Sequence, residues 1–544
     1  MVFSLAHLGA EGNRTLDNTF DVIVVGAGSA GCIVANRLSR DPASSVLVLE
    51  AGGWDWNPLI SIPVGARKMT QWGLYEWGDM SEPDPQLEGR RNPVLHGKVV
   101  GGSSSLNYMA HTRGHPRDYE QWAAAAAGWG FDDVLPFFKE IEAWEGGEDD
   151  WRGGHGEVGA IEPTLSDPIF EAGVKMVKSQ GYHITPDFNG ATPQGVGRMQ
   201  FSVRNGRRAS SAAVFLRPVL RRRNLTVRTQ AFVTKILFEG RQAVGVEYIH
   251  GGRRHVARST RRTVLCLGAI NTPHLLMLSG IGPADHLRAC GIEPFVDLPV
   301  GKGLQDHLGF GLTWSRQTPG PFHRLLRFDR IGMAMIQAQL FGSGPASAPP
   351  AALVGFLCTD PSLSQPDVEI VFSTVPSAAD YWFPGVKRAY TDGYAIRSWL
   401  LSQKSRGEIL LRSSDPRDRP RIIINALSAV EDRETMRAAF RRMWAMGEAP
   451  ELAPFRDARV TPDRELKTDA EIDAFVAAQT TPQYHPACTC AMGDAPHTVV
   501  SADLSVHGVE GLNVVDASVM PTLISGNPNV VIMMMAAKAA SLWT

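Results

Sequence analysis

The clearest hydrophobic pattern lies near the start of the chain. Residues 21–25 form an almost continuous apolar, β-branched run, which is typical of a strand buried on both faces of a parallel sheet. A glycine-rich turn follows at residues 26–31, and the apolar residues within 33–38 then recur at helical spacing. A second apolar run, residues 46–49, ends at Glu50. These segments predict one strand–helix–strand unit of a parallel sheet.

The middle of the chain has a different pattern. Residues 431–446 have helical periodicity, whereas residues 368–372 and 408–412 are short strand-like runs. The turn at residues 415–418 favours an antiparallel sheet with hairpins. Residues 320–350 become rich in Gly, Pro, Ala and Ser toward their end, which indicates a mobile or covering segment.

Composition and charge exclude several classes of partner. The 544 residues are 44% hydrophobic and 20% charged, as in ordinary soluble globular proteins. The formal net charge of −2 gives no reason to expect a polyanionic partner. We therefore expect the arginine clusters at 221–223 and 253–254 to lie on loops and strand ends rather than to bind nucleic acid. Six scattered cysteines favour a reducing compartment, and Cys488 and Cys490 have no second pair that would complete a zinc site. We expect no metal site.

The termini carry no recognisable membrane or export signal. Residues 1–19 lack a basic segment and contain Glu11, which argues against a secretory leader. The longest apolar stretch, residues 530–537, is too short to span a bilayer. We therefore expect a cytoplasmic protein without a transmembrane segment.

The first glycine turn has the spacing of a dinucleotide site. Gly26 permits a tight turn, Gly28 lets the backbone approach a pyrophosphate, and Gly31 lets helix and strand pack closely. Glu50 follows about twenty residues on, at the end of the next strand, where a carboxylate can bind the adenosine ribose. This fingerprint does not distinguish NAD from FAD.

A second glycine block makes that distinction. Residues 96–108 place Gly101 and Gly102 directly before three serines, a layout suited to close backbone contact with a planar ring and its diphosphate. With four further segments in the same order, the block resembles the signatures of the glucose–methanol–choline (GMC) oxidoreductases. The further segments are residues 113–119, 268–282, 484–493 and 515–529. The resemblance covers nearly the whole chain and is weakest between about 311 and 400.

The resemblance implies the fold and the cofactor. We expect an α/β (α+β composite) GMC fold, with a Rossmann-type FAD-binding domain and an inserted antiparallel-sheet substrate domain. The expected FAD-binding domain is discontinuous and comprises residues 18–160, 201–310 and 481–544. The expected substrate-binding domain comprises residues 161–200 and 311–480. Members with a covalent flavin carry a histidine in or beside the second block, where this chain has Leu106 and Asn107, so we expect non-covalent FAD.

The resemblance also implies flavin contacts. One set of residues holds the pyrophosphate, the ribose and the adenine, and it comprises Gly26, Gly28, Gly31, Glu50 and Val233. A second set lines the isoalloxazine ring and comprises Val100, Gly101, Gly102, Ser103 and Asn107. Asp516 and Ala517 belong near the ribityl chain and pyrophosphate, and Asn529 near the pyrimidine edge. His111 departs from the family pattern, and we interpret it as a structural residue.

The resemblance further implies a catalytic pair. His485 matches the family's base, and histidine suits the removal of a hydroxyl proton because its pKa lies near neutrality. Asn527 stands at a position that is histidine or asparagine in the family. Its amide can donate a hydrogen bond to the alcohol oxygen without taking a proton.

These residues predict an FAD-dependent alcohol oxidase or dehydrogenase. We expect a primary alcohol with an aromatic or otherwise apolar body, because residues 311–400 are rich in aromatic side chains and contain Met333 and Met335. Oxygen or a quinone-type compound would accept the electrons. A choline dehydrogenase-like enzyme with a quinone-type acceptor and a flavin-bearing lyase of the same family remain alternatives. So do an NAD-dependent dehydrogenase, which leaves residues 97–107 unexplained, and a non-catalytic flavin scaffold.

Overall fold

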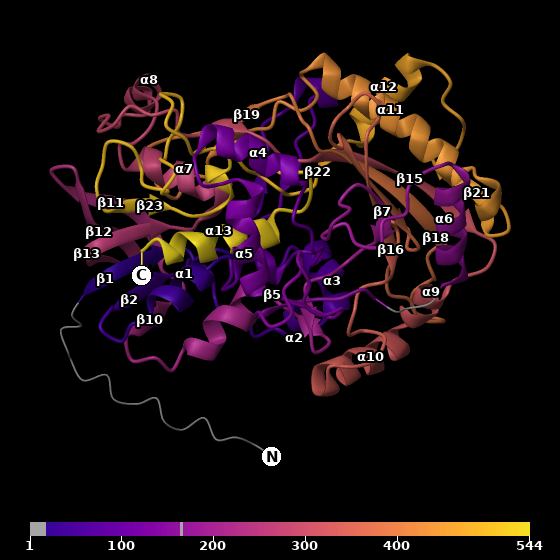
Figure 1. The fold of residues 1–544 in the computed structure, drawn as a ribbon, viewed down its shortest axis with the longest axis horizontal. Coiled ribbons are helices and arrows are strands. Elements are labelled where there is room, and N and C mark those ends of the chain that lie inside the picture. The colour runs from indigo at the N-terminus through magenta and orange to yellow at the C-terminus, as the bar shows by residue number, and fades with distance from the viewer. Residues whose placement is uncertain (1–17, 164–166, 544) are drawn as a thin grey trace.

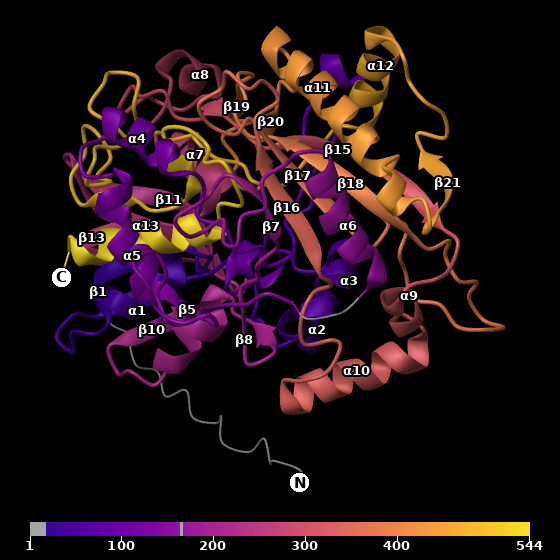
Figure 2. The ribbon, with the colours of Figure 1, turned by 45° about the vertical axis from the view of Figure 1, so that its right-hand side comes forward.

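The computed structural model describes residues 18–163 and 167–543 (Figure 1). The expectation about a leader concerns residues that lie mostly outside this range. In both views the strands gather into two groups that lie side by side, with β1 and β13 in one and β15 to β18 in the other (Figures 1 and 2). The mixed α/β fold class predicted from the sequence is confirmed.

The first sheet contains the predicted strand–helix–strand unit. Its strands run in the order β10–β2–β1–β13–β12–β11, and β23 pairs with β13. Their bounds are β1 Thr19–Val25, β2 Val46–Leu49, β10 Leu225–Arg228, β11 Phe232–Glu239, β12 Gln242–His250, β13 Arg253–Leu265 and β23 Leu512–Val514. The strands β10, β2, β1, β13 and β23 are parallel, whereas β11, β12 and β13 form an antiparallel meander.

Strand β13 joins these two arrangements. Its first part, Arg253–Arg258, pairs antiparallel with β12 after a turn in which Gly251 and Gly252 have positive φ. Its last residues pair parallel with β1 on one side and with β23 on the other. The edge of the parallel half is therefore covered by a strand from the far end of the chain.

Helices from both ends of the chain pack beside this sheet. α1 (Gly31–Leu38) contacts α13 (Asn529–Ser541), which also contacts α5 (Phe131–Ile141). Figure 1 shows α13, in yellow, lying across the indigo α1. α13 is buried almost throughout, so residues 530–537 form a core helix. Within the described ranges, no helix is long and apolar enough to cross a membrane.

The second sheet is antiparallel, in the order β21–β15–β18–β17–β16–β7, with β22 paired to β15. Its strands are β7 Gly195–Arg198, β15 Leu308–Arg316, β16 Ala352–Leu357, β17 Val368–Ser373, β18 Gly393–Leu400, β21 Arg456–Thr461 and β22 Thr481–Pro482. α11 (Val430–Gly447) and α6 (Pro168–Ser179) pack against the strands, and α12 (Asp469–Gln479) packs against α11. The predicted helix at 431–446 and strand at 368–372 are confirmed as α11 and β17.

The shorter elements lie around the two sheets. A three-stranded sheet has the order β14–β19–β20, and the predicted strand at 408–412 falls in its middle strand. The bounds are α2 Pro58–Ser61, α3 Ala66–Gln71, α4 Pro116–Ala125, α7 Gly268–Leu278, α8 Ala284–Ala289, β14 Lys302–Leu304, β19 Gly407–Leu410 and β20 Arg421–Ile423.

The expected covering segment at residues 320–350 is largely helical. It forms α9 (Pro321–Leu325) and α10 (Phe328–Phe341), and α10 lies at the edge of the molecule (Figure 2). α10 packs the small residues Ala334 and Ala338 inward and leaves Met333 67% exposed. The glycine- and proline-rich composition describes only the residues after this helix.

Candidate active site

The first glycine turn lies where β1 enters α1, with no room for a side chain at Gly26 or Gly31. A Cβ on Gly31 would lie 1.9 Å from the Gly26 carbonyl oxygen, and one on Gly26 would lie 2.6 Å from the Cys266 carbonyl oxygen. Gly26 also has a φ of +96°, which disfavours other residues. These two glycines let the strand, the turn and the helix pack closely against one another. A phosphate-binding turn at a helix N-terminus, called the phosphate cradle below, requires this close packing.

The second glycine block meets the first at Gly28. A Cβ on Gly102 would lie 2.8 Å from the Gly28 Cα, and the Gly101 N–H donates to the Ala27 carbonyl at 2.6 Å. The structure therefore brings together Gly28 and Gly102, although 74 positions separate them in the sequence. Two glycine-rich backbones therefore lie against each other here, and such close backbone approach suits contact with a dinucleotide.

Glu50 lies directly beneath the first turn. Its carboxylate accepts hydrogen bonds from the Ala27 N–H at 2.8 Å and the Gly52 N–H at 2.7 Å. Burial raises the pKa of Glu50 to about 7, and these backbone bonds oppose that rise. The carboxylate is thus held at the carboxyl end of β2, beside the turn.

A cavity opens at the carboxyl ends of β1 and β2. Its walls include Val25, Leu49 and Val233, together with Trp77. Val233 is the residue predicted near the adenine. A cavity at this edge of a parallel sheet is where such folds bind dinucleotides, so the residues present fit the adenosine half of FAD.

Polar residues of the second block are held by Arg208. Its guanidinium donates to the Asn107 side-chain oxygen at 2.7 Å and to the Asn107 carbonyl at 2.6 Å. Ser103 accepts a hydrogen bond from the Gly97 N–H at 3.1 Å, and Val100 is fully buried. Arg208 is a positioning residue that the sequence did not reveal, because it lies about 100 positions away in another segment.

The C-terminal residues of the predicted flavin site come from two segments. Asp516 accepts hydrogen bonds from the Gly268 N–H at 2.9 Å and the Thr272 hydroxyl at 2.7 Å, so it caps α7. Ala517 follows it in a buried turn. Asn529 begins α13 and accepts a hydrogen bond from Ser29, within the first glycine turn, at 2.8 Å. Asn529 therefore ties the end of the chain to the phosphate cradle.

The predicted catalytic pair is in contact. The Asn527 amide nitrogen lies 3.3 Å from the His485 Nε2. A third residue, His307, lies on the other side of the imidazole, with its Nδ1 3.0 Å from the His485 Nδ1. Nothing in the sequence indicated His307, because 178 positions separate it from His485.

The hydrogen bonds fix the protonation of these rings. The His307 Nε2 lies 3.1 Å from the Ile524 carbonyl, which can only accept, so this nitrogen carries the proton. The His307 Nδ1 then accepts from the His485 Nδ1–H. The His485 Nε2 is therefore unprotonated, with its lone pair toward Asn527. This tautomer is the one that a base requires.

Burial keeps both rings neutral. It lowers the pKa of His307 to about 3, and it lowers the pKa of His485 well below its usual value, with a further contribution from His307. Asp306 accepts a hydrogen bond from the His485 backbone N–H at 2.8 Å, and burial raises the pKa of Asp306 to about 8. The imidazole is thus anchored through its ring and its backbone.

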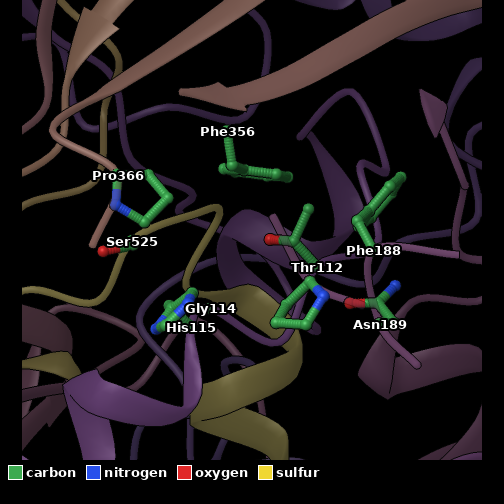
Figure 3. Close-up of a pocket in the computed structure, with 9 residues that line it drawn as sticks. Thr112, Gly114, His115, Phe188, Asn189, Phe356, Pro366 and Ser525 are labelled. Atoms are coloured by element: carbon green, nitrogen blue, oxygen red, sulfur yellow. The ribbon is translucent and has the colours of Figure 1, made fainter. Parts of the chain in front are cut away.

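A small cavity lies beside Asn527. Thr112 lines it and also exchanges hydrogen bonds with Asn527, accepting from the backbone N–H at 2.7 Å and donating to the carbonyl at 3.2 Å. Figure 3 shows Phe356 on the opposite wall from the Gly114–His115 backbone, with Ser525 and Pro366 at one side. One wall is therefore aromatic and comes from the second sheet, whereas the other is polar.

His111 belongs to a separate buried network. Its ring lies 2.9 Å from a Glu142 carboxylate oxygen and 3.0 Å from the Ser202 hydroxyl. Arg113 and Arg152 both pair with Glu142, and these two positive neighbours lower the pKa of that carboxyl despite its burial. A structural role for His111 fits these contacts. Over residues 18–163 and 167–543, no cluster of His, Cys, Asp and Glu could hold a metal.

A Rossmann-type sheet with a double glycine cradle and an adjoining histidine–asparagine pair defines a dinucleotide-dependent oxidoreductase. Two family models, both described as GMC oxidoreductase, match residues 20–309 and 403–536. The chain belongs to the GMC oxidoreductases, and it is an FAD-dependent oxidoreductase that acts on CH–OH groups.

Individual relatives cover nearly the whole chain. It is 39% identical to an oxygen-dependent choline dehydrogenase of Sinorhizobium fredii, over 96% of this chain and 94% of the relative. It is 38% identical to the mitochondrial choline dehydrogenase of Mus musculus, over 96% and 89%. Among solved structures, pyridoxine 4-oxidase from Mesorbium loti has 30% identity and a TM-score of 0.86, with 96% and 99% coverage.

Proposed function

We propose that this protein oxidises a primary alcohol to the aldehyde, with His485 as the base and Asn527 as the hydrogen-bond donor to the alcohol oxygen. The observation that carries the proposal is the chain of hydrogen bonds from Ile524 through His307 to His485, which leaves the His485 Nε2 unprotonated and facing the Asn527 amide.

The chain's own residues perform the proton chemistry. The Nε2 of His485 takes the hydroxyl proton, and the Asn527 amide stabilises the negative charge that develops on the oxygen. The His485 Nδ1–H keeps its bond to His307, so the ring need not turn. When bound, FAD supplies the hydride acceptor at N5.

We propose that FAD is bound non-covalently. The cradle of Gly26, Gly28 and Gly102 and the cavity beside Val233 support this placement. Glu50 would bind the ribose, and Asn107 the ring. We also propose the other flavin contacts that the resemblance implies and the division into an FAD-binding and a substrate-binding domain. We further propose that the protein is cytoplasmic and that oxygen or a quinone accepts the electrons.

The residues behind the expected aromatic substrate lie in different places. Trp314 stacks on Tyr394 in the core, and Phe372 packs against α6 beside Gly173. Met333 is turned to solvent. Phe356 alone among these residues lines the cavity beside Asn527. An aromatic substrate stays a prediction, supported by this one wall.

The second candidate substrate is an alcohol with a quaternary ammonium group, and we favour it over an aromatic alcohol. The relatives named as choline dehydrogenases match 96% of the chain. Phe356 suits this substrate equally well, because an aromatic face attracts a cation.

Anaerobic addition of alcohols to the FAD-loaded protein tests the proposal. Oxidation of the substrate should bleach the flavin absorbance, whereas a lyase or a scaffold would leave the spectrum unchanged. A flavin that stays oxidised with choline, benzylic, aliphatic and sugar alcohols alike would refute the proposal.

A further inference from the structure

Arg208 carries a buried charge that no carboxylate in the described part of the chain neutralises. It ends the short strand β9 (Arg207–Arg208), and it is 3% exposed. Three other arginines are about as deeply buried, and each of them forms an ion pair with a glutamate: Arg37, Arg113 and Arg152. Because buried charges are normally paired, Arg208 departs from a pattern that the chain follows elsewhere.

The hydrogen bonds of Arg208 go to neutral oxygens. Its Nε donates to the Ile60 carbonyl at 2.8 Å, and its Nη1 donates to the Ser104 carbonyl at 3.2 Å and to both oxygens of Asn107 at 2.6 and 2.7 Å. Its Nη2 is buried and meets no acceptor within residues 18–163 and 167–543. Burial lowers the pKa of Arg208 to about 9, and the Tyr108 phenol opposes this fall. The guanidinium is therefore still positive at neutral pH.

The segment that carries this charge contacts both glycine blocks. Ser104 and Asn107, which Arg208 binds, belong to the second block. Three residues after Arg208, the Ser211 backbone N–H donates to the Ser104 hydroxyl at 3.0 Å, and the Ser211 hydroxyl donates to the Ser29 carbonyl in the first glycine turn at 2.7 Å. Residues 208–211 thus join the block proposed to line the isoalloxazine ring to the phosphate cradle.

The ionisable groups already described at the flavin site supply no buried positive charge. Burial keeps the rings of His307 and His485 neutral, because it lowers the pKa of each. Glu50 and Asp516 are acids, and both accept hydrogen bonds from backbone N–H groups. Lys98, in the second block, is exposed, so water screens its charge. Arg208 is the cation that adjoins this site away from water.

We propose that Arg208 stabilises the negative charge of the reduced flavin and thereby raises the reduction potential of the holoenzyme. Transfer of a hydride from the alcohol carbon adds two electrons and one proton to the flavin. The hydroxyl proton goes to His485, so the reduced ring carries one negative charge. A cation in a buried site stabilises such a charge far more than a cation in water does.

This inference rests on the proposed FAD binding and alcohol oxidation, and it adds the residue that sets how readily the flavin accepts electrons. The reduction potential of the holoenzyme tests it without any alcohol, by equilibration with dyes of known potential in the absence of oxygen. If the reduced ring is an anion, two electrons enter with one proton. The equilibrium constant for reduction of the wild type should then fall about tenfold, or about 30 mV, for each unit of rising pH from 6 to 8. A roughly hundredfold fall per unit would show that the reduced ring is neutral, and it would overturn the inference.

Two variants separate the charge of Arg208 from its hydrogen bonds. Arg208→Gln removes the charge, and it should lower the equilibrium constant for reduction at pH 7 by about tenfold or more, which is about 30 mV. Arg208→Lys keeps the charge but loses the planar fork of donors, and it should stay within about threefold of the wild type. Arg37→Gln is the matched control. Arg37 is also buried, but its charge is paired with Glu157 at 2.8 Å, so its loss should change the constant less than about threefold.

Equal losses in Arg208→Gln and Arg208→Lys would overturn the inference, because they would show that Arg208 acts only by positioning Asn107. An equal loss in Arg37→Gln would also overturn it, since the removal of any buried arginine would then have the same effect. The pH dependence of the wild type decides the question even if a variant does not fold. Failure of every alcohol to reduce the flavin would instead refute the proposed function, and the potentials could still be measured.

Discussion

The role of His307 gives the most specific prediction about the mechanism. In His307→Leu, the Nδ1–H of His485 loses its acceptor on the side of the ring that faces the fully buried position 307. Leaving a buried donor unpaired costs about 1–3 kcal/mol. The imidazole can relieve this cost by moving its proton to Nε2, which removes the lone pair that the alcohol needs. A change of about 1–3 kcal/mol in the tautomer balance corresponds to a roughly 5- to 150-fold loss in the rate of flavin reduction.

Rapid-mixing spectroscopy of the holoenzyme without oxygen measures this rate directly. His307→Gln is the informative companion, because its amide can still accept from His485 and donate to the Ile524 carbonyl, so it should recover much of the rate. Both variants should retain FAD, since His307 makes no contact with the glycine cradle. Equal rates for His307→Leu and the wild type would refute the tautomer argument. Equal losses in the two variants would show that His307 acts through packing alone.

The other predictions concern the pair itself, pH and the cofactor. His485→Ala should lower kcat/KM by roughly 10²–10⁴-fold with FAD still bound, and Asn527→Ala should cost less, since it removes a neutral donor; steady-state kinetics with the preferred alcohol measures both. Because burial lowers the pKa of His485 well below its usual value, the base is unprotonated at neutral pH, so kcat/KM should stay level from pH 6.5 to 8 and fall only in acid; a tenfold fall between pH 8 and pH 7 would contradict this. Acid precipitation should release yellow FAD into the supernatant, and a flavin that stays with the pellet would disprove non-covalent binding.

The sequence predicted the parts of the fold that local patterns encode. The strand, turn and helix of residues 21–38 could be predicted, because a strand buried on both faces, a turn that requires glycine and a helical repeat follow one another. α11 was readable because its apolar positions repeat over many turns. The pairing of β13 with different strands on its two edges could not be predicted, because the residues of a strand do not specify which strand pairs with each edge.

The site could be predicted only where motifs mark it. His485 and Asn527 lie in distinctive segments, whereas His307 is an ordinary residue at the start of a strand and acquires its role from a contact across the fold. The aromatic residues of 311–400 show the same limit. Composition counts Trp314 and Phe356 equally, but the sheet turns one into the core and the other toward a cavity.

The late arrival of β23 has a consequence for biosynthesis. Roughly 250 residues separate the end of β13 from β23, which pairs with its open edge. At about 5–20 residues per second, a ribosome needs on the order of ten to fifty seconds to make them. During that time the nascent chain presents an unpaired, apolar strand edge of the kind that recruits other strands. The insertion of the second sheet therefore sets how long each newly made molecule needs protection from its neighbours, and every residue added there would lengthen that interval.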